Sequence, residues 1–199
     1  EDTDNDVKLR STILSQMIFS EDTLDESGDN DRPLDQRPVT KSVFDLFIQN
    51  KHELNKISGD IRSTVLAVTA RAGDDETLDF LIGTYKSTSD AELQQDIAAG
   101  LTAVRKPDQI DQLIDMFKKS DIIRTQDLSH WFVWLLSNRS ARVKTWQWLK
   151  DNWTWIEDTF GGDKSFDIFP RYAGQIFSTD RMLSEYKDLF LPMRDEPAL

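Results

Sequence analysis

The spacing of the apolar residues is the feature that most limits how this chain of 199 residues can fold. Steps of three and four recur almost throughout, as in the stripe of Leu9, Ile13 and Met17, and such steps place side chains on one face of an α-helix. Alternation with a period of two, which marks half-buried strands, is nowhere sustained. Eight Gly and six Pro are also too few for a turn-rich all-β protein. The sequence therefore predicts an all-α fold.

The stripes and breaks predict about ten helices. Their approximate ranges are 9–18, 43–51, 61–72, 74–85, 89–104, 107–117, 126–137, 140–159, 166–177 and 179–190. Gly73 is expected to end the third helix in the left-handed conformation. Ser89-Asp90-Ala91-Glu92 has the form of a capping box that opens the fifth. Pro107 suits the first turn of the sixth, and Gly161-Gly162 is expected to stop the long eighth helix.

Helices of similar length joined by short loops favour antiparallel pairs that stack on one another. We predict a right-handed superhelical stack of the HEAT or armadillo kind, because each helix can bury a face only against its neighbours. A compact irregular bundle is the alternative. The prediction is one helical domain over 1–199, in which 1–38 are acidic and partly loop, 39–192 form the stack and 193–199 are a polar tail.

The net charge of −12 is concentrated near the start of the chain, because residues 1–35 contribute −8 of it. Nucleic acids and anionic membranes are therefore disfavoured as partners, since both bind through Lys and Arg. The absence of Cys fits a reducing compartment, and we expect a cytoplasmic protein. The longest apolar run, 131–136, is too short to span a bilayer. The chain begins with Glu rather than Met, so we expect a fragment of a longer protein.

Apolar residues lie on two opposite faces of the predicted helix 140–159. One face carries Val143, Trp146, Leu149, Trp153, Ile156 and Phe160. Trp148 and Trp155 lie about 200° away from Trp146 around the helix, and a helix with two apolar sides is normally held between layers. The tryptophans are therefore either core residues or part of an interface to another domain. The candidate interface residues are Trp131, Trp134, Trp148 and Trp155.

Several elements of the chain, in order, resemble the C-terminal domain of aminopeptidase N-type zinc aminopeptidases, especially bacterial enzymes of the kind found in lactic acid bacteria. These elements are Ile123-Arg124-Thr125-Gln126-Asp127, the Trp-rich stretch 138–153, Gly161-Gly162-Asp163 with Phe166, and Phe177-Ser178-Thr179 with Leu183, Glu185 and Phe190. Leu9-Arg10, Asp60-Ile61-Arg62 and Tyr85-Lys86-Ser87-Thr88 extend the resemblance upstream more weakly. The chain departs from the family pattern at Ser140, where Gly is usual, and at Trp148, where Phe is frequent.

The resemblance implies a helical domain that is not itself an enzyme. In this family, zinc is held by His-Glu-x-x-His and a later Glu, and a Gly-x-Met-Glu-Asn loop binds the free N-terminus; both are absent here, so no cofactor is expected in this chain. The domain would cap the active site of the parent zinc aminopeptidase and line its substrate chamber. Its partners would be the catalytic domain of the same polypeptide and the peptide substrates.

Arg124, Gln126 and Asp127 are the candidate residues for facing that chamber. A purely structural role is the alternative, in which Asp127 caps the following helix and Arg124 pairs with a carboxylate of the preceding turn.

His52-Glu53-Leu54-Asn55-Lys56 comes nearest to the zinc motif. However, Lys56 stands where the second His is needed, and an ammonium group cannot bind zinc. His130 is expected at an interface or at the edge of the core. The acidic residues Asp22, Asp25, Asp29 and Asp31 lack the Gly and the terminal Glu of a calcium-binding loop.

Two other function classes stay open at this point. A free-standing helical-repeat adaptor would bind a protein on a concave face. A metal-independent enzyme would need a cluster of titratable residues in a cleft, and the sequence points to none.

Overall fold

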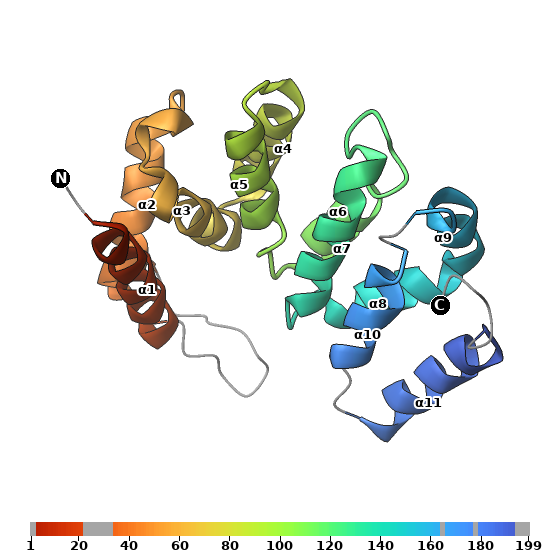
Figure 1. Cartoon of the computed structure of the whole chain (residues 1–199). Helices are drawn as coiled ribbons and strands as arrows, with labels where there is room; N and C mark the ends of the chain where they lie inside the picture. Colours follow the sequence, from red (N-terminus) through yellow and green to blue (C-terminus); the bar gives the residue numbers. More distant parts are fainter. Residues whose placement is uncertain (1–2, 22–33, 164–165, 177–178, 194–199) are drawn as a thin grey trace. The chain divides into compact units, whose positions relative to one another are not determined.

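The computed structural model describes residues 3–21, 34–163, 166–176 and 179–193 (Figure 1). Over these ranges the chain forms eleven α-helices and four short 3-10 helices, without a strand, so the predicted all-α class is confirmed. None of the described helices has the length and apolar character of a membrane span. The chain divides into two compact units, Glu1–Arg105 and Lys106–Leu199. The predictions of a single domain and of one continuous superhelical stack stay predictions, and each unit is described by itself.

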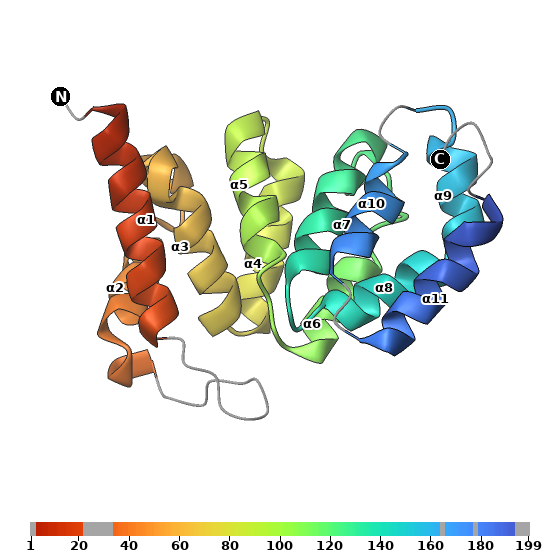
Figure 2. The same cartoon turned by 60° about the horizontal axis from the view of Figure 1, so that its bottom comes forward.

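The first unit holds five α-helices and two 3-10 helices. They are α1 (Asp4–Glu21), η1 (Leu34–Gln36), α2 (Pro38–Asn50), η2 (Leu54–Lys56), α3 (Gly59–Ala72), α4 (Asp75–Ser87) and α5 (Ala91–Leu101). Helix α2 packs on α3 and α4 packs on α5, while α3 packs on α5 and α1 packs on α3. Figure 2 shows α1 and α2 at one edge of this unit, with α3 between α1 and the α4–α5 pair. Phe47, Val65, Leu66 and Ile97 are fully buried between the layers.

A carboxylate joins the first two helices of this unit. Glu21 ends α1 and accepts hydrogen bonds from the backbone nitrogens of Val39 (2.9 Å) and Thr40 (2.8 Å) in the first turn of α2. Those nitrogens have no partner within the helix, and a negative charge at a helix N-terminus is favourable. Glu21 therefore fixes the end of α1 to the start of α2. The acidic residues Asp22, Asp25, Asp29 and Asp31, which lack the pattern of a calcium-binding loop, lie outside the described residues.

Two predicted helix ends are wrong in detail. Gly73 follows α3 with φ −76° and ψ 164°, so it is extended and not left-handed. Glycine fits there because an added Cβ would lie 2.7 Å from the carbonyl oxygen of Thr69. The N-cap of α5 is Asp90 and not Ser89, since the Asp90 carboxylate accepts from the backbone nitrogens of Glu92 (3.0 Å) and Leu93 (3.1 Å). Asp74 caps α4, since its carboxylate accepts from the backbone nitrogen of Thr77 at 2.9 Å.

The second unit holds six α-helices and two 3-10 helices. They are α6 (Pro107–Ile114), η3 (Thr125–Asp127), α7 (Leu128–Ser137), α8 (Arg142–Asp151), α9 (Trp153–Phe160), α10 (Ile168–Gln175), α11 (Asp180–Phe190) and η4 (Leu191–Met193). Helix α7 packs on α8 and α10, α6 packs on α8, and α10 packs on α11. Pro107 opens α6 as predicted, and α9 ends where Gly161 begins.

The predicted single helix 140–159 is wrong, because it is two helices separated at Asn152. This residue has φ −122° and ψ 16°, outside the helical region. Its side-chain amide donates a 2.7 Å hydrogen bond to the carbonyl oxygen of Trp148. Asn side chains compete for backbone partners in this way and are therefore poor residues inside helices. The predicted apolar face is nevertheless buried on both sides of the break, at Trp146, Leu149, Trp153, Ile156 and Phe160, whereas Val143 is 58% exposed.

Candidate functional site

The segment before α7 presents the three polar residues that we predicted to face a substrate chamber. Arg124 donates from Nε to Oδ2 of Asp127 at 2.7 Å. The guanidinium-bearing side chain is 57% exposed and that of Asp127 26%, and Gln126 is exposed. Asp127 makes no side-chain capping hydrogen bond to α7, because its carboxylate is turned toward Arg124. The expected cap at Asp127 is therefore wrong, whereas the expected pairing of Arg124 with a carboxylate of the preceding turn stays a prediction.

Buried residues hold this segment in place at both ends. Ile123 and Leu128 are each 1% exposed, so the backbone enters and leaves the core of the unit on either side of η3. The polar side chains between them are consequently directed to the surface. An exposed guanidinium can bind a carboxylate with two hydrogen bonds, so this segment can chemically recognise an anionic group.

The candidate interface residues of α7 have different environments. Trp131 is 1% exposed and belongs to the core of the second unit. Trp134 is half-buried and its ring stacks on His130, with centroids 5.8 Å apart and planes at 24°. His130 itself is exposed. Of these two tryptophans, Trp134 is the one with surface that another domain can reach.

Trp148 of α8 and Trp155 of α9 meet across the Asn152 break. Their rings are edge to face with centroids 6.1 Å apart, and Trp148 rests in the same geometry on Phe117 at 4.8 Å. The ammonium group of Lys118 lies 5.3 Å from the centre of the Trp155 ring, within cation–π range. Both tryptophans are half-buried. We call these two residues the Trp148–Trp155 pair; it offers flat apolar surface beside a cation.

The opposite side of α8 is tied to α11. The indole nitrogen of Trp146 and the ammonium group of Lys150 donate to the same oxygen of Glu185, at 2.9 and 2.7 Å. These hydrogen bonds, that of Lys150 first, hold the pKa of Glu185 below its usual range. Trp146 and Glu185 are both residues of the family resemblance, and the structure brings them into contact although 39 positions separate them.

The first unit contains a buried arginine, Arg62, whose ion pairs the sequence analysis did not predict. Arg62 of α3 is 5% exposed and donates from Nε to Asp96 of α5 at 2.6 Å and from Nη2 to Glu92 at 2.9 Å. Burial raises the pKa of Asp96 above its usual range, although the hydrogen bond from Arg62 acts to lower it. The sequence carried one signal, since Arg62 follows Ile61 on the apolar side of the predicted helix.

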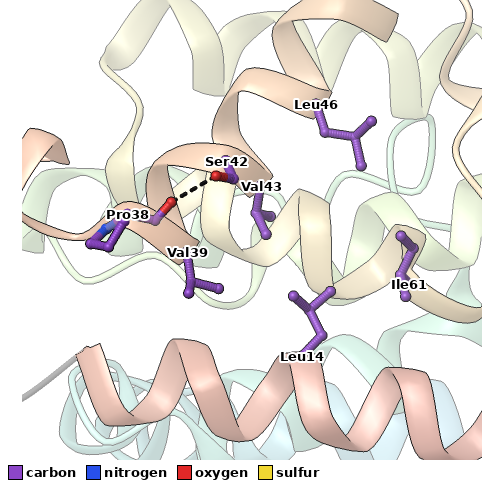
Figure 3. Close-up of a pocket in the computed structure, with 7 residues that line it drawn as sticks. All are labelled: Leu14, Pro38, Val39, Ser42, Val43, Leu46 and Ile61. Carbon is purple, nitrogen blue, oxygen red and sulfur yellow. Dashed lines mark hydrogen bonds between the residues drawn. The ribbon is translucent and has the colours of Figure 1, made fainter.

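A hollow opens between α1, α2 and α3 (Figure 3). It measures about 400 Å³ and is lined by Leu14, Pro38, Val39, Ser42, Val43, Leu46 and Ile61. The hydroxyl of Ser42, its only polar side chain, donates to the carbonyl oxygen of Pro38 at 2.8 Å. The lining thus presents almost pure hydrocarbon, which suits an apolar side chain and not a charged ligand.

No metal-binding cluster forms in the part of the chain that the structure describes, where three or more His, Asp or Glu side chains nowhere come together. In the segment nearest to a zinc motif, Lys56 pairs with Glu53 at 2.6 Å and His52 is exposed. The residues of this segment therefore do not fit a zinc ion.

A model of the ERAP1-like C-terminal domain family matches residues 1–199. Aminopeptidase N of Lactobacillus delbrueckii subsp. lactis is 28% identical over 190 residues, which cover 95% of this chain and 21% of the relative. Aminopeptidase N of Lactobacillus helveticus is 28% identical over 199 residues, covering 100% of this chain and 22% of the relative. Endoplasmic reticulum aminopeptidase 1 of Mus musculus is 23% identical over 195 residues, which cover 92% of this chain and 21% of the relative. The chain thus spans about a fifth of the length of these relatives.

Proposed function

We propose a function for this chain from one premise, which is that it belongs to the family of ERAP1-like C-terminal domains. In this proposal it is the non-catalytic C-terminal domain of a zinc metallo-aminopeptidase that releases N-terminal amino acids from peptides. It caps the active site and lines the substrate chamber. The observation that carries the proposal is a family match over the whole chain, combined with aminopeptidase relatives that are about five times as long.

The zinc of the parent enzyme would be held outside this chain. Among the described residues no side chains gather that could bind it. What this domain contributes is therefore binding and enclosure: it orients a peptide and keeps bulk water away from the site where the chemistry occurs.

The surface of the second unit offers the chemistry that such enclosure needs. The Arg124 guanidinium can pair with a carboxylate of a bound peptide, and the Trp148–Trp155 pair can cover apolar side chains of the catalytic domain. In the proposal, Arg124, Gln126 and Asp127 face the chamber. Trp134 and the Trp148–Trp155 pair contact the catalytic domain of the same polypeptide.

Replacing Arg124 in the full-length aminopeptidase tests the chamber role. We expect Arg124→Ala to raise KM for peptides of about ten residues roughly fivefold, because a hydrogen bond of an exposed charge is worth about 1 kcal/mol. The kcat for a single amino-acid amide, which is too short to reach this domain, should stay unchanged. Arg171→Ala is the matched control, since Arg171 is also an exposed arginine of the second unit. Equal KM values for both variants and the native protein would remove Arg124 from the chamber.

A further inference from the structure

Helix α1 exposes a stripe of large apolar side chains. Leu9, Ile13 and Met17 follow one another by four residues and are 58%, 49% and 46% exposed. No charged residue occurs between Arg10 and Glu21. A run of this kind on a surface helix departs from the usual pattern, in which the outer face is charged. We call Leu9, Ile13 and Met17 the α1 stripe.

The α1 stripe lies on the side of the helix away from its packed face. Ile18 is the buried residue of α1, and at 100° per residue the centre of the stripe lies about 140° away from it. Helix α3 of the same unit is different, because it is covered on several sides. Its buried residues are Arg62, Val65, Leu66, Val68, Thr69 and Ala70. The contrast indicates that α1 has room for a neighbour that the described residues do not supply.

The contacts among the helices of the first unit indicate that the missing neighbour of α1 is another helix. Each of the pairs α2–α3 and α4–α5 has a first and a second helix, and the second helices α3 and α5 pack on each other. Helix α1 packs on α3 in the same way (Figure 2). It therefore occupies the place of a second helix whose first helix is not among the described elements. In a repeat stack, the outer face of a terminal helix is normally polar, and this one is not.

The hollow beside α1 extends the apolar surface. Leu14 projects from α1 into it (Figure 3) and lies about 60° around the helix from Met17. Met17 is thus the residue of the α1 stripe that lies nearest to the hollow around the helix.

We propose that the α1 stripe is the docking surface for one amphipathic helix from the remainder of the parent polypeptide, which pairs with α1 as α2 pairs with α3. The inference rests on the proposed function, in that it takes the chain to be one domain of a longer protein. The relatives, about five times as long as this chain, have the length to supply such a helix. The absence of charge between Arg10 and Glu21 favours an apolar face of the partner over an acidic or basic one.

Thiol labelling tests this surface directly, because the chain contains no Cys. Ile13→Cys places a reporter in the α1 stripe, and Ile48→Cys, at a 52% exposed position of α2, is the matched control. Each variant is labelled with iodoacetamide, both in the 199-residue chain and in the full-length protein, and the label is located by peptide mass spectrometry. We expect both sites to react at similar rates in the 199-residue chain. In the full-length protein, Ile13→Cys should react about tenfold more slowly, because a docked helix must open first, and Ile48→Cys at an unchanged rate.

Equal labelling rates for Ile13→Cys in the short and the full-length protein would overturn the inference. Protection in the 199-residue chain that disappears on dilution would also overturn it, since a second copy would then cover the stripe. Zinc content and aminopeptidase activity of the full-length protein are measured in parallel. An active zinc enzyme with an unprotected stripe contradicts this inference alone, whereas a protected stripe in a zinc-free, inactive protein contradicts the proposed function alone.

Discussion

The indole nitrogen of Trp146 donates a 2.9 Å hydrogen bond to Oε2 of Glu185, which fixes α11 to α8. The same oxygen accepts from Lys150 at 2.7 Å. The rings of Tyr186 and Phe190 lie beside the Trp146 ring, with centroids 6.4 and 6.5 Å away. Helix α11 is therefore joined to α8 by the Glu185 carboxylate, beside a cluster of aromatic rings. Hydrogen bonds fix the position of a helix more specifically than hydrocarbon packing does. Removing the bond to Glu185 should therefore lower the free energy of unfolding by a measurable amount.

Trp146→Phe should destabilise the protein more than Trp153→Phe. The two substitutions remove the same volume from the same cluster, so their packing losses are similar. Trp146 also loses its hydrogen bond to Glu185, whereas the buried indole nitrogen of Trp153 has no hydrogen-bond partner in the part of the chain that the structure describes. We expect a difference of about 1–2 kcal/mol in the free energy of unfolding, measured by urea denaturation. Equal losses would mean that the hydrogen bond contributes nothing.

Acid should weaken the attachment of α11. The pKa of Glu185 is lowered in the folded protein, from an ordinary value of 4.5. Its contribution to stability is therefore fully present above pH 4.5 and is lost as the pH falls through the lower folded pKa. Glu185→Gln has no carboxylate to titrate. The stability difference between the native protein and this variant should shrink below pH 4.5, as followed by urea denaturation from pH 7 to pH 3.

Asp96 titrates in the opposite sense in the native protein. Its pKa is raised by burial, so its ionisation opposes folding above the folded pKa and this cost disappears as the pH falls toward 3.8. The native protein and the Glu185→Gln variant both contain Asp96. The effect of Asp96 therefore cancels when the free energies of unfolding of the two proteins are subtracted. A difference that stays constant from pH 7 to pH 3 would contradict a lowered pKa for Glu185.

Two glycines of the first unit should respond oppositely to the same substitution. In Gly100→Ala, the new Cβ would lie 2.6 Å from Cβ and 2.9 Å from the carbonyl carbon of Leu66, where α5 approaches α3. We expect a loss of about 1–3 kcal/mol from this overpacking. Gly83→Ala, in the exposed middle of α4, meets nothing within 4 Å. It should stabilise the protein by about 0.5–1 kcal/mol through helix propensity. Thermal unfolding of the two variants gives the comparison.

The buried arginine of α3 should be costly to remove by itself. Arg62→Met leaves Asp96 largely buried and without the guanidinium, which we expect to cost about 3–5 kcal/mol. The double variant Arg62→Met/Asp96→Leu removes both charges, and it should lose clearly less than the sum of the two single variants. A double-mutant cycle by urea denaturation measures this coupling. Additive losses would show that the two side chains act independently.

The apolar periodicity predicted the helical class and most of the helices, because burial requires one face of each helix to be apolar. The predicted helix boundaries were wrong where side chains compete for hydrogen bonds with the backbone. The helix 140–159 looked continuous because its apolar residues keep their spacing through Asn152, yet this side chain binds the Trp148 carbonyl and breaks the helix. At the start of α5, Ser89 and Asp90 are both good caps, and spacing alone did not decide between them.

The candidate site was harder to predict than the fold. The positions of Arg124 and Asp127 suggested separate roles, whereas in the structure each is the partner of the other. The four tryptophans differ in burial, and Trp131 is enclosed while Trp134 is not, although both lie on α7. These outcomes depend on which neighbouring helix covers each side chain. Contacts between residues far apart in the chain do not follow from spacing within one helix.

Activity with and without the remainder of the polypeptide is the most direct test of the proposed function. The 199-residue chain and the full-length protein encoded by its gene are purified and compared for zinc content and for release of an N-terminal amino acid from a peptide. We predict that the 199-residue chain is zinc-free and inert, and that the full-length protein binds zinc and is active. A gene that encodes only these 199 residues, or a full-length protein without aminopeptidase activity, would contradict the account.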